Sequence, residues 1–324
     1  MVKEYVIGID IGGTFTKIGL VDAEGAVLKN TVYKTGANAA FGDFLKKLEM
    51  EVVLLKNALN DNDRLISIGV GAPNANYLTG NMEHPVNFRW GDIVPLVTEI
   101  EKLFGLPVHI ANDANAAALG ELYFGSGKNM KDFVILTLGT GLGSGIIANG
   151  EILRGAHGMA GEIGHVNVDP NGRNCKCGLQ GCLETYASVT GIKRTVFELL
   201  AEMTDESLMR QISYDEMTGE TIANAALEGD VVALKAFEKT ASVLGSKMAD
   251  TAAHLDPEAF ILSGGLSKAG AILLDPVVAS MEENLFKAYK GKIKVMISDL
   301  PGASAVLGPA ALAWQQIDRT KTKA

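Results

Sequence analysis

The chain has 324 residues, of which 47% are apolar and 21% charged, so a sizeable core is expected and wholesale disorder is excluded. At roughly 100–200 residues per domain, this length corresponds to about two domains. The 38 acidic side chains outnumber the 29 basic ones and give a net charge of −9, which argues against a dedicated nucleic-acid binder because an acidic surface repels phosphate backbones.

The cysteine count and the hydropathy pattern indicate the cellular compartment in which the protein is expected to reside. Three cysteines, an odd number, make a poor disulfide framework. No apolar run approaches the roughly 18 residues of a membrane span, and the N-terminal residues show no charged-then-apolar signal. These features predict a soluble, cytoplasmic protein without a membrane partner.

The chain opens with a pattern of strand, turn and strand. Residues 5–11 form an apolar run, Gly12-Gly13-Thr14 turns the chain, and residues 16–21 and 27–35 continue as strands, which predicts three antiparallel strands. Apolar side chains at helical spacing then predict a helix over residues 40–59. The segments that follow are strands over residues 66–72 and 108–111 and helices over residues 93–104 and 114–124.

The opening pattern recurs in the second part of the chain. Residues 133–138 are an apolar run, Gly139-Thr140-Gly141 is a turn, and residues 143–148 resume as a strand. Without gaps, Ile11-Gly12-Gly13-Thr14 lies over Leu138-Gly139-Thr140-Gly141, 127 residues later. Two such units, each followed by helices and strands, indicate a duplicated α/β fold, although two unrelated glycine-rich hairpins would give the same local pattern.

The remaining segments are mostly helical. Helices are expected over residues 189–203, 222–227, 231–255 and 310–317, and strands over residues 259–262 and 294–297. Since no low-complexity linker is present, the boundary is expected near Asn112–Asn115. This gives a small N-terminal domain over residues 1–114 and a larger domain over residues 115–307, with a C-terminal helix over residues 308–319 packing back on the first domain.

Two glycine-rich turns are candidate phosphate sites. The first is Gly12-Gly13-Thr14, preceded by Asp10, whose carboxylate could orient a hydrated Mg²⁺; the second is Gly139-Thr140-Gly141-Leu142-Gly143. Glycines let backbone amides approach a phosphate closely. Neither turn has the Walker or the Gly-x-Gly-x-x-Gly pattern. Most Gly-Gly-Thr turns are ordinary hairpins, whereas the second turn has more glycine than a hairpin requires. Two such loops facing each other across a cleft would clamp a polyphosphate.

Asn112-Asp113 follows a short strand and precedes an alanine-rich helix. Either side chain suits the N-cap position of that helix. A carboxylate at a strand end that faces a cleft could instead act as a general base on a hydroxyl. The sequence leaves both interpretations open.

The cysteines form a candidate metal site. Cys175, Cys177 and Cys182 lie within eight residues, and His165 precedes them by ten. Three thiolates and one imidazole match a tetrahedral Cys₃His site and suit Zn²⁺ rather than Mg²⁺ or Ca²⁺. The alternative is a chance cluster of reduced cysteines in a loop.

These motifs together resemble the ROK family of sugar kinases and repressors. The block Gly164-His165, Gly172, Cys175-x-Cys177-Gly178-x-x-Gly181-Cys182-x-Glu184 is similar to the family signature position by position. The two glycine turns resemble its two phosphate loops, Asn112-Asp113-Ala114-Asn115-Ala116 its catalytic segment, and Ser263-Gly264-Gly265 its turn beside adenosine.

The resemblance implies a role for each matched residue. Asp113 corresponds to the general base. The sugar would be held by Asn87, Asn112, Asp113, Glu162, His165 and Glu184. The nucleotide would contact Asp10, Gly12, Gly13, Thr14, Gly139, Thr140, Gly141, Leu142, Gly143, Gly264 and Gly265. Structural Zn²⁺ would be bound by His165, Cys175, Cys177 and Cys182.

The resemblance also implies a fold and an activity. The fold would be a pair of duplicated actin-like ATPase (ribonuclease H-like) α/β domains flanking a cleft, in a homodimer. The activity would be ATP- and Mg²⁺-dependent phosphorylation of a hexose primary hydroxyl, with glucose as the first expectation. Kinases for N-acetylmannosamine, N-acetylglucosamine, fructose or mannose are the alternatives.

Two positions depart from the family pattern. Phe15 stands where the family usually has a lysine after Gly-Gly-Thr, so Lys17 receives no phosphate role. Val86 separates Pro85 from Asn87 in the segment beside the sugar, which weakens the match at Asn87.

Two other classes of protein share parts of this pattern. A sugar-responsive repressor of the same family would carry an N-terminal helix-turn-helix, whereas the first strand here is expected near Tyr5. A sugar-binding regulator without a DNA-binding domain is therefore the less favoured alternative. A polymerising actin-type protein would have no use for the cysteine block or for Asn112-Asp113.

Overall fold

The computed structural model describes residues 2–85, 88–300 and 304–323. The chain divides into two compact units: residues 1–129, 150–160 and 299–324 form the first, and residues 130–149 and 161–298 form the second. The boundary expected at residue 114 differs from this division. Helix α3 (Asp113–Phe124) packs against the C-terminal helix α8 (Ser304–Lys323), and both belong to the first unit.

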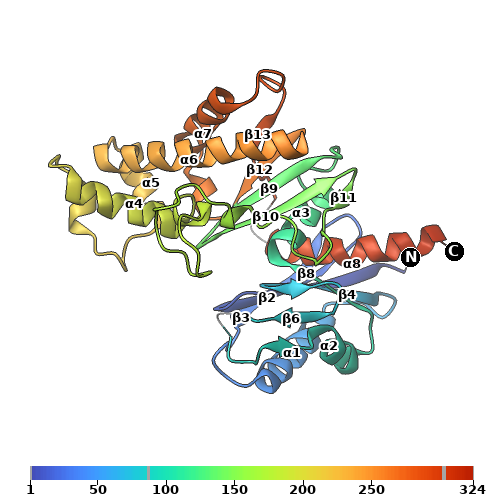
Figure 1. Ribbon diagram of the computed structural model, residues 1–324. Helices are drawn as coiled ribbons and strands as arrows, with labels where there is room; N and C mark the ends of the chain where they lie inside the picture. The colour runs from blue at the N-terminus through green and yellow to red at the C-terminus, as the bar shows by residue number, and fades with distance from the viewer. Residues whose placement is uncertain (1, 86–87, 301–303, 324) are drawn as a thin grey trace. The chain divides into compact units, whose positions relative to one another are not determined.

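A five-stranded sheet forms the centre of the first unit (Figure 1). Its strand order is β3-β2-β1-β4-β8, with β1 antiparallel to β2, β2 antiparallel to β3, and β1, β4 and β8 parallel to one another. The bounds are β1 Glu4–Ile11, β2 Phe15–Val21, β3 Val27–Lys34, β4 Arg64–Ala72 and β8 Val108–Asn112. The predicted opening of three antiparallel strands is therefore confirmed.

Helices cover both faces of this sheet. Helix α1 (Phe41–Lys56) buries Phe44, Leu48, Val52 and Leu55, which lie at helical spacing on one side. Helix α8 crosses β1 and β4 so closely that a Cβ on Gly69 would overlap the carbonyl oxygen of Pro309. Glycine in the middle of β4 is therefore required by the close approach of α8.

A small three-stranded sheet completes the first unit. It contains β5 (Ala75–Asn76), β6 (Asn81–Glu83) and β7 (Ile93–Val94) in that order. The helix expected over residues 93–104 is wrong at its start, because Ile93 and Val94 pair with β6 and helix α2 begins only at Leu96. Helix α2 (Leu96–Phe104) ends at Gly105, which adopts the left-handed conformation of a C-cap. The two-residue strand β11 (Glu151–Ile152) also belongs to this unit.

The second unit repeats the strand arrangement of the first. Four neighbouring strands run in the order β10-β9-β12-β13, with β9 antiparallel to β10 and parallel to β12, and β12 parallel to β13. Their bounds are β9 Phe133–Leu138, β10 Leu142–Ala148, β12 Ala259–Ser263 and β13 Lys294–Ile297. This is the arrangement of β2-β1-β4-β8, so the recurrence of the hairpin in the sequence reflects a duplicated α/β topology.

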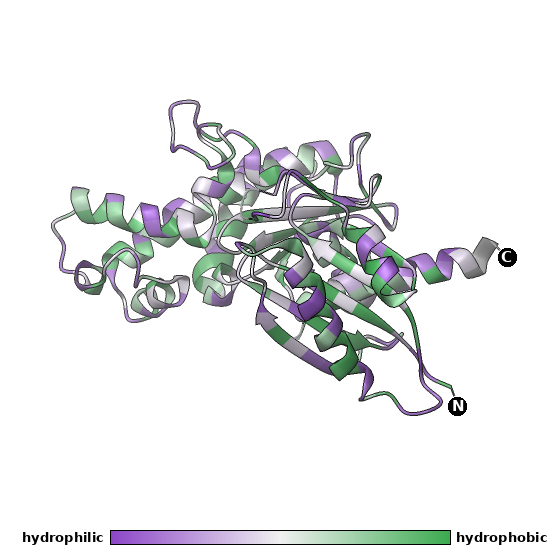
Figure 2. Ribbon diagram, turned by 90° about the horizontal axis from the view of Figure 1, so that it is seen from below, coloured by the Kyte–Doolittle hydropathy of each residue, from purple (hydrophilic) through white to green (hydrophobic). Residues whose placement is uncertain are grey.

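Helices of the second unit pack on one another and on its sheet. They are α4 (Val189–Glu202), α5 (Gly219–Leu227), α6 (Val231–Leu255) and α7 (Ala271–Asn284), and α6 lies alongside α7 (Figure 1). Short 3₁₀ helices are η1 (Ile163–His165), η2 (Leu183–Thr185), η3 (Leu208–Gln211) and η4 (Leu266–Ala269). Along the helices hydrophilic and hydrophobic residues alternate, as expected for elements with one face on a core (Figure 2). Within the described ranges, none of the helices combines the length and apolar character needed to cross a bilayer.

Candidate active site and metal centre

The first glycine turn closes the β1–β2 hairpin and is held by hydroxyl groups. The Gly12 N–H donates to the Phe15 carbonyl at 3.0 Å. The Thr35 hydroxyl donates to the Gly12 carbonyl at 2.6 Å, and the Thr35 N–H donates to the Thr14 carbonyl at 3.0 Å. Thr16 Oγ1 lies 2.9 Å from Thr35 Oγ1. Since the Thr35 hydrogen is directed at Gly12, Thr16 is the donor of that pair.

This bracing leaves two backbone amides open at the tip of the turn. Gly13 and Thr14 are exposed, and their N–H groups have no hydrogen-bond acceptor within the described part of the chain. Successive unpaired N–H groups in a turn form a concave, partly positive surface that suits an anion. Two adjacent amides of the first turn therefore remain available to an anion.

Asp10 lies at the end of β1, directly before this turn. Lys17 faces it across the hairpin, with Lys17 Nζ 3.4 Å from Asp10 Oδ2. Burial raises the pKa of Asp10 to about 6; the charge of Lys17 lowers it and that of Asp113 raises it. No phosphate role was predicted for Lys17, and the structure places it as the counter-ion of Asp10.

Asn112 and Asp113 lie at the start of α3. The Ala114 N–H is shared between Asn112 Oδ1 at 2.9 Å and Asp113 Oδ1 at 2.7 Å. Capping by Asn112 is thus confirmed. The Asp113 side chain is accessible to solvent, yet desolvation by surrounding protein raises its pKa, while the bond from Ala114 opposes the shift.

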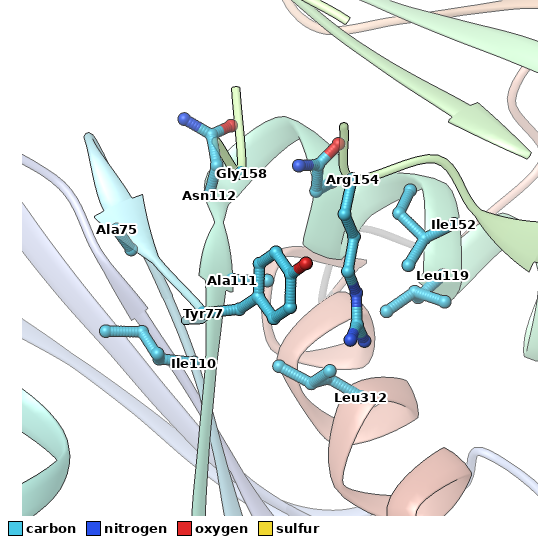
Figure 3. A pocket seen from close by; sticks show the side chains of 11 residues that line it. Ala75, Tyr77, Ile110, Ala111, Asn112, Leu119, Ile152, Arg154, Gly158 and Leu312 are labelled. Carbon is cyan, nitrogen blue, oxygen red and sulfur yellow. The ribbon is translucent and has the colours of Figure 1, made fainter. Parts of the chain in front are cut away.

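A cavity of about 10 Å³ lies beneath Asn112 in the first unit (Figure 3). Tyr77 and Arg154 line it, and the Arg154 guanidinium is stacked over the Tyr77 ring at 4.3 Å from the centroid. Asn115 also lines it, and its buried Oδ1 has no hydrogen-bond partner within the described residues. The space accommodates one water molecule and is far too small for a hexose or a nucleotide, so this cavity is not a substrate site.

The second glycine turn connects β9 to β10 and repeats the open-amide pattern. The Gly139 N–H donates to the Gly141 carbonyl at 3.0 Å. The N–H groups of Thr140 and Gly141 meet no acceptor in the described chain. The next amide, that of Leu142, is occupied, because it donates to Glu184 Oε2 at 3.0 Å.

The turn after β12 packs on this second glycine turn. Gly264 has φ +93°, and a Cβ there would lie 2.7 Å from the Leu138 backbone, so both conformation and space require glycine. The Ser267 hydroxyl donates to the Gly264 carbonyl at 2.9 Å. The candidate nucleotide residues Gly264 and Gly265 are therefore brought to the base of the second glycine turn within one unit.

The three cysteines and His165 converge in the second unit. One ligand atom from each lies within 4.8 Å of all the others. Cys177 Sγ is 3.7 Å from Cys182 Sγ, and Cys175 Sγ is 3.8 Å from His165 Nδ1. Tetrahedral Zn²⁺ with Zn–S bonds of about 2.3 Å requires S···S edges of about 3.8 Å. The side chains are thus spaced as such an ion requires.

The chemistry of these donors also fits a metal ion. Burial and the hydrogen bonds and charges of Cys177 and Cys175 raise the pKa of Cys182 to about 12, and burial raises the pKa of Cys175. Burial raises the pKa of Cys177 as well, but hydrogen bonds outweigh that effect and lower it below its usual value. A cation bound by these residues would displace the thiol protons and stabilise the thiolates. Divalent zinc is the ion whose ligand preferences this set satisfies.

Arg173 fixes the loop that carries the cysteines. Its guanidinium donates to the carbonyls of Thr185 at 2.6 Å and Gly191 at 3.0 Å, pairs with Glu198, and stacks on Tyr186 at 4.4 Å from the ring centroid. The sequence did not single out this arginine, because its partners lie 12 to 25 residues away and no local pattern marks them.

The remaining predicted sugar residues occupy different environments. Glu162 is exposed and precedes η1, whereas Glu184 is half-buried in η2, with Oε1 3.8 Å from Cys175 Sγ. Asn87 lies outside the described residues. The first unit thus gathers Asp10, Gly12, Gly13, Thr14, Asn112 and Asp113. The second gathers the second glycine turn, the Gly264-Gly265 turn, Glu162, Glu184 and the candidate metal ligands.

The chain is 37% identical over 324 residues to a glucokinase of Halalkalibacterium halodurans, covering 98% of this chain and 97% of that protein. It is 31% identical over 313 residues to a xylose repressor of Caldicellulosiruptor bescii, covering 95% of this chain and 77% of that protein.

A solved structure shares the whole fold. The ROK family glucokinase of Streptomyces griseus, determined in complex with glucose and AMPPNP, is 35% identical and superposes with a TM-score of 0.81 over 96% of this chain and 99% of that one. The predicted fold class is confirmed by this match. The model of the ROK family matches residues 6–316, and since that is nearly the entire chain, the protein belongs to the ROK family.

Proposed function

We propose that this protein is an ATP-dependent glucokinase that transfers the γ-phosphoryl group of ATP to the primary hydroxyl of glucose. The observation that carries the proposal is the end-to-end similarity to the Streptomyces griseus enzyme, whose structure holds both glucose and an ATP analogue. The two glycine turns support it, because each presents a pair of open amides that a phosphate chain can use.

Asp113 would act as the general base. Its carboxylate would accept the proton of the glucose primary hydroxyl while that oxygen attacks the γ-phosphorus, and the bond to the β,γ-bridging oxygen would break to release ADP. A raised pKa suits this role, because a base whose pKa approaches the working pH accepts a proton more readily. The sharing of the Ala114 N–H with Asn112 keeps the carboxylate oriented.

The glycine turns would hold the phosphates of ATP in both units. In the first, the amides of Gly13 and Thr14 are free to bind phosphate oxygens, and Asp10 would orient the water shell of Mg²⁺. In the second, the amides of Thr140 and Gly141 serve the same purpose, and Gly264 and Gly265 would border the adenosine. Charge neutralisation and positioning are the main demands of phosphoryl transfer.

The residues that would bind glucose are Asn87, Asn112, Asp113, Glu162, His165 and Glu184. A hexose offers hydroxyls that both donate and accept, and carboxylates held in place are suitable acceptors for them. We infer that His165, Cys175, Cys177 and Cys182 hold a structural Zn²⁺, which when bound fixes the loop that carries Glu162 and Glu184.

The test is a coupled assay of ADP release with a panel of sugars. Purified protein with MgATP should release ADP with glucose, and less with mannose, fructose, N-acetylglucosamine and N-acetylmannosamine. Release that is fastest with another sugar would reassign the substrate, and release with none of them would overturn the kinase proposal. The homodimer expected from the family resemblance is tested by light scattering on the same sample.

A sugar-responsive regulator is the second candidate. The observation that favours it is the match of 95% of this chain to a xylose repressor. A regulator would bind a sugar without releasing ADP. Calorimetric glucose binding in the absence of any sugar-dependent ADP release would therefore favour this candidate over the kinase.

A further inference from the structure

Glu184 contacts two parts of the second unit that have separate proposed roles. Its Oε1 lies 3.8 Å from the Sγ of Cys175, one of the candidate metal ligands. Its Oε2 accepts the N–H of Leu142, at the end of the second glycine turn, at 3.0 Å. The two residues of that hydrogen bond are 42 positions apart in the chain, so the carboxylate joins the cysteine loop to the candidate nucleotide loop.

Gly141 provides the space for this carboxylate. A Cβ on Gly141 would overlap Glu184 Oε2. The φ of Gly141 does not lie in the left-handed region, so the close approach of Glu184, rather than backbone conformation, requires glycine there. The atom that would have to move is the end of a flexible side chain, so a residue with a Cβ at position 141 would displace the carboxylate.

The rest of this region is already fixed by the backbone. The Val189 N–H donates to the Gly139 carbonyl at 2.9 Å, and the Ser188 hydroxyl donates to the Glu184 carbonyl at 2.7 Å. These bonds hold one end of the turn and the main chain at Glu184. The other end of the turn, at Leu142, is held by the Glu184 side chain, which is half-buried and therefore less screened than a surface carboxylate.

We propose that Glu184 is a positioning residue for the nucleotide loop: its carboxylate fixes the end of the Gly139–Leu142 turn so that the Thr140 and Gly141 amides face a phosphate, and so couples the cysteine loop to nucleotide affinity. This goes beyond a sugar-binding role for Glu184 and rests on the proposed function only in that the second turn binds the nucleotide. Sugar and nucleotide affinities are then linked through one side chain.

The first experiment compares two substitutions at Glu184. Binding of a non-hydrolysable ATP analogue with Mg²⁺ is measured by calorimetry in the absence of sugar. Glu184→Ala should weaken the analogue roughly tenfold, the loss expected for one charge-assisted hydrogen bond. Glu184→Gln should stay within about threefold of the parent protein, because its amide oxygen still accepts the Leu142 N–H. Glu216→Ala removes an exposed glutamate of the same unit and serves as the matched control.

A double-mutant cycle then tests the contact with Gly141. Gly141→Ala should weaken the analogue as much as Glu184→Ala, because its Cβ displaces the carboxylate. In the Glu184→Ala background the same substitution should cost little more, since nothing remains to be displaced. A full additional loss in that background would mean that the Cβ meets the nucleotide itself, and it would overturn the proposed link.

The outcomes separate this inference from the proposed function. If the parent protein and Glu184→Ala bind the analogue equally and the parent shows glucose-dependent ADP release, the link is overturned and the kinase proposal stands. If Glu184→Ala binds the analogue more weakly than Glu184→Gln, but no sugar of the panel causes ADP release by the parent protein, the link is supported and the kinase proposal is overturned. Thermal unfolding midpoints of all variants identify any loss caused by misfolding.

Discussion

The two glycine turns occupy equivalent positions in two sheets of the same topology, yet they are held by different chemistry. The first turn is braced by the hydroxyl of Thr35, directly after β3, which also accepts from the Thr16 hydroxyl in β2. The second is held by a carboxylate, Glu184, from the loop that carries the cysteines. Both turns leave two successive amides open, but the first depends on threonines beside its own hairpin, whereas the second depends on a carboxylate from outside its sheet.

The difference also separates the roles of the two units. The first unit contains the carboxyl groups with raised pKa values, Asp10 and Asp113, which suit proton transfer and Mg²⁺. The second contains the candidate metal ligands and the glutamates that suit recognition of hydroxyls. On this comparison, substitutions of Asp10 and Asp113 should change turnover, and substitutions of the candidate metal ligands and glutamates of the second unit should change affinity.

The largest expected effect is that of Asp113→Asn. The amide cannot accept the hydroxyl proton, so turnover measured by ADP release should fall roughly 10²- to 10⁴-fold. Glucose affinity measured by calorimetry should stay within about threefold, because asparagine keeps the shape and the acceptor oxygen. Near-normal turnover would remove Asp113 from its role and break the division between the two units.

Substitution of a candidate metal ligand tests whether the second unit determines glucose affinity. Cys175→Ser should lower the zinc content measured by atomic emission and weaken glucose binding roughly 10- to 100-fold, since the loop that carries Glu162 and Glu184 loses its anchor. The ATP analogue should be weakened less, because only the Glu184 contact reaches the nucleotide turn. Well-folded parent protein without zinc would rule out the metal assignment.

The pH profile tests the carboxyl pair of the first unit. Asp10 has a pKa of about 6, so its proton is bound below that pH and the charge that would orient Mg²⁺ is lost. Plots of kcat/KM should therefore fall on the acid side of about pH 6, by about tenfold per pH unit. Lys17 lowers the pKa of Asp10, so Lys17→Met should move this limb to higher pH. A limb that is unchanged in Lys17→Met would assign it to another group.

The smallest expected effect concerns the brace of the first turn. Thr35→Val removes the hydroxyl that serves Gly12 and Thr16 and should lower the free energy of unfolding by about 1–3 kcal/mol, because Thr35 is buried and the Gly12 carbonyl loses its donor. Chemical denaturation measures this change. Thr31→Val, at a less buried position of β3, is the control and should change stability by less than about 0.5 kcal/mol.

Much of the fold follows from local sequence. The strands before and after Gly12-Gly13-Thr14 and the helix over residues 231–255 were predicted from periodicity and turn residues, and the structure confirms them. Helix α7, which contains Pro276, was not predicted, and α2 starts later than expected because Ile93 and Val94 pair with β6. These are cases in which tertiary contacts override local preference.

In the candidate site, too, local patterns were predictable from sequence and long-range contacts were not. The Cys175, Cys177 and Cys182 spacing predicted a metal cluster, and the structure brings these thiols and His165 together. The pairing of Lys17 with Asp10 follows from hairpin register and was not anticipated. The bond from Leu142 to Glu184 joins residues that no periodic pattern relates, so the sequence could not reveal it. The catalytic role of Asp113 remains a prediction.

Helix α8 packs closely on β4 at Gly69, and this contact can form only late in synthesis of the protein. The strands of the first unit leave the ribosome early, but the helix that covers β1 and β4 is made after residue 300. During translation the second unit can therefore complete its core while the first still exposes an uncovered apolar sheet. The nascent N-terminal half must stay protected from aggregation until the final helix has been synthesised.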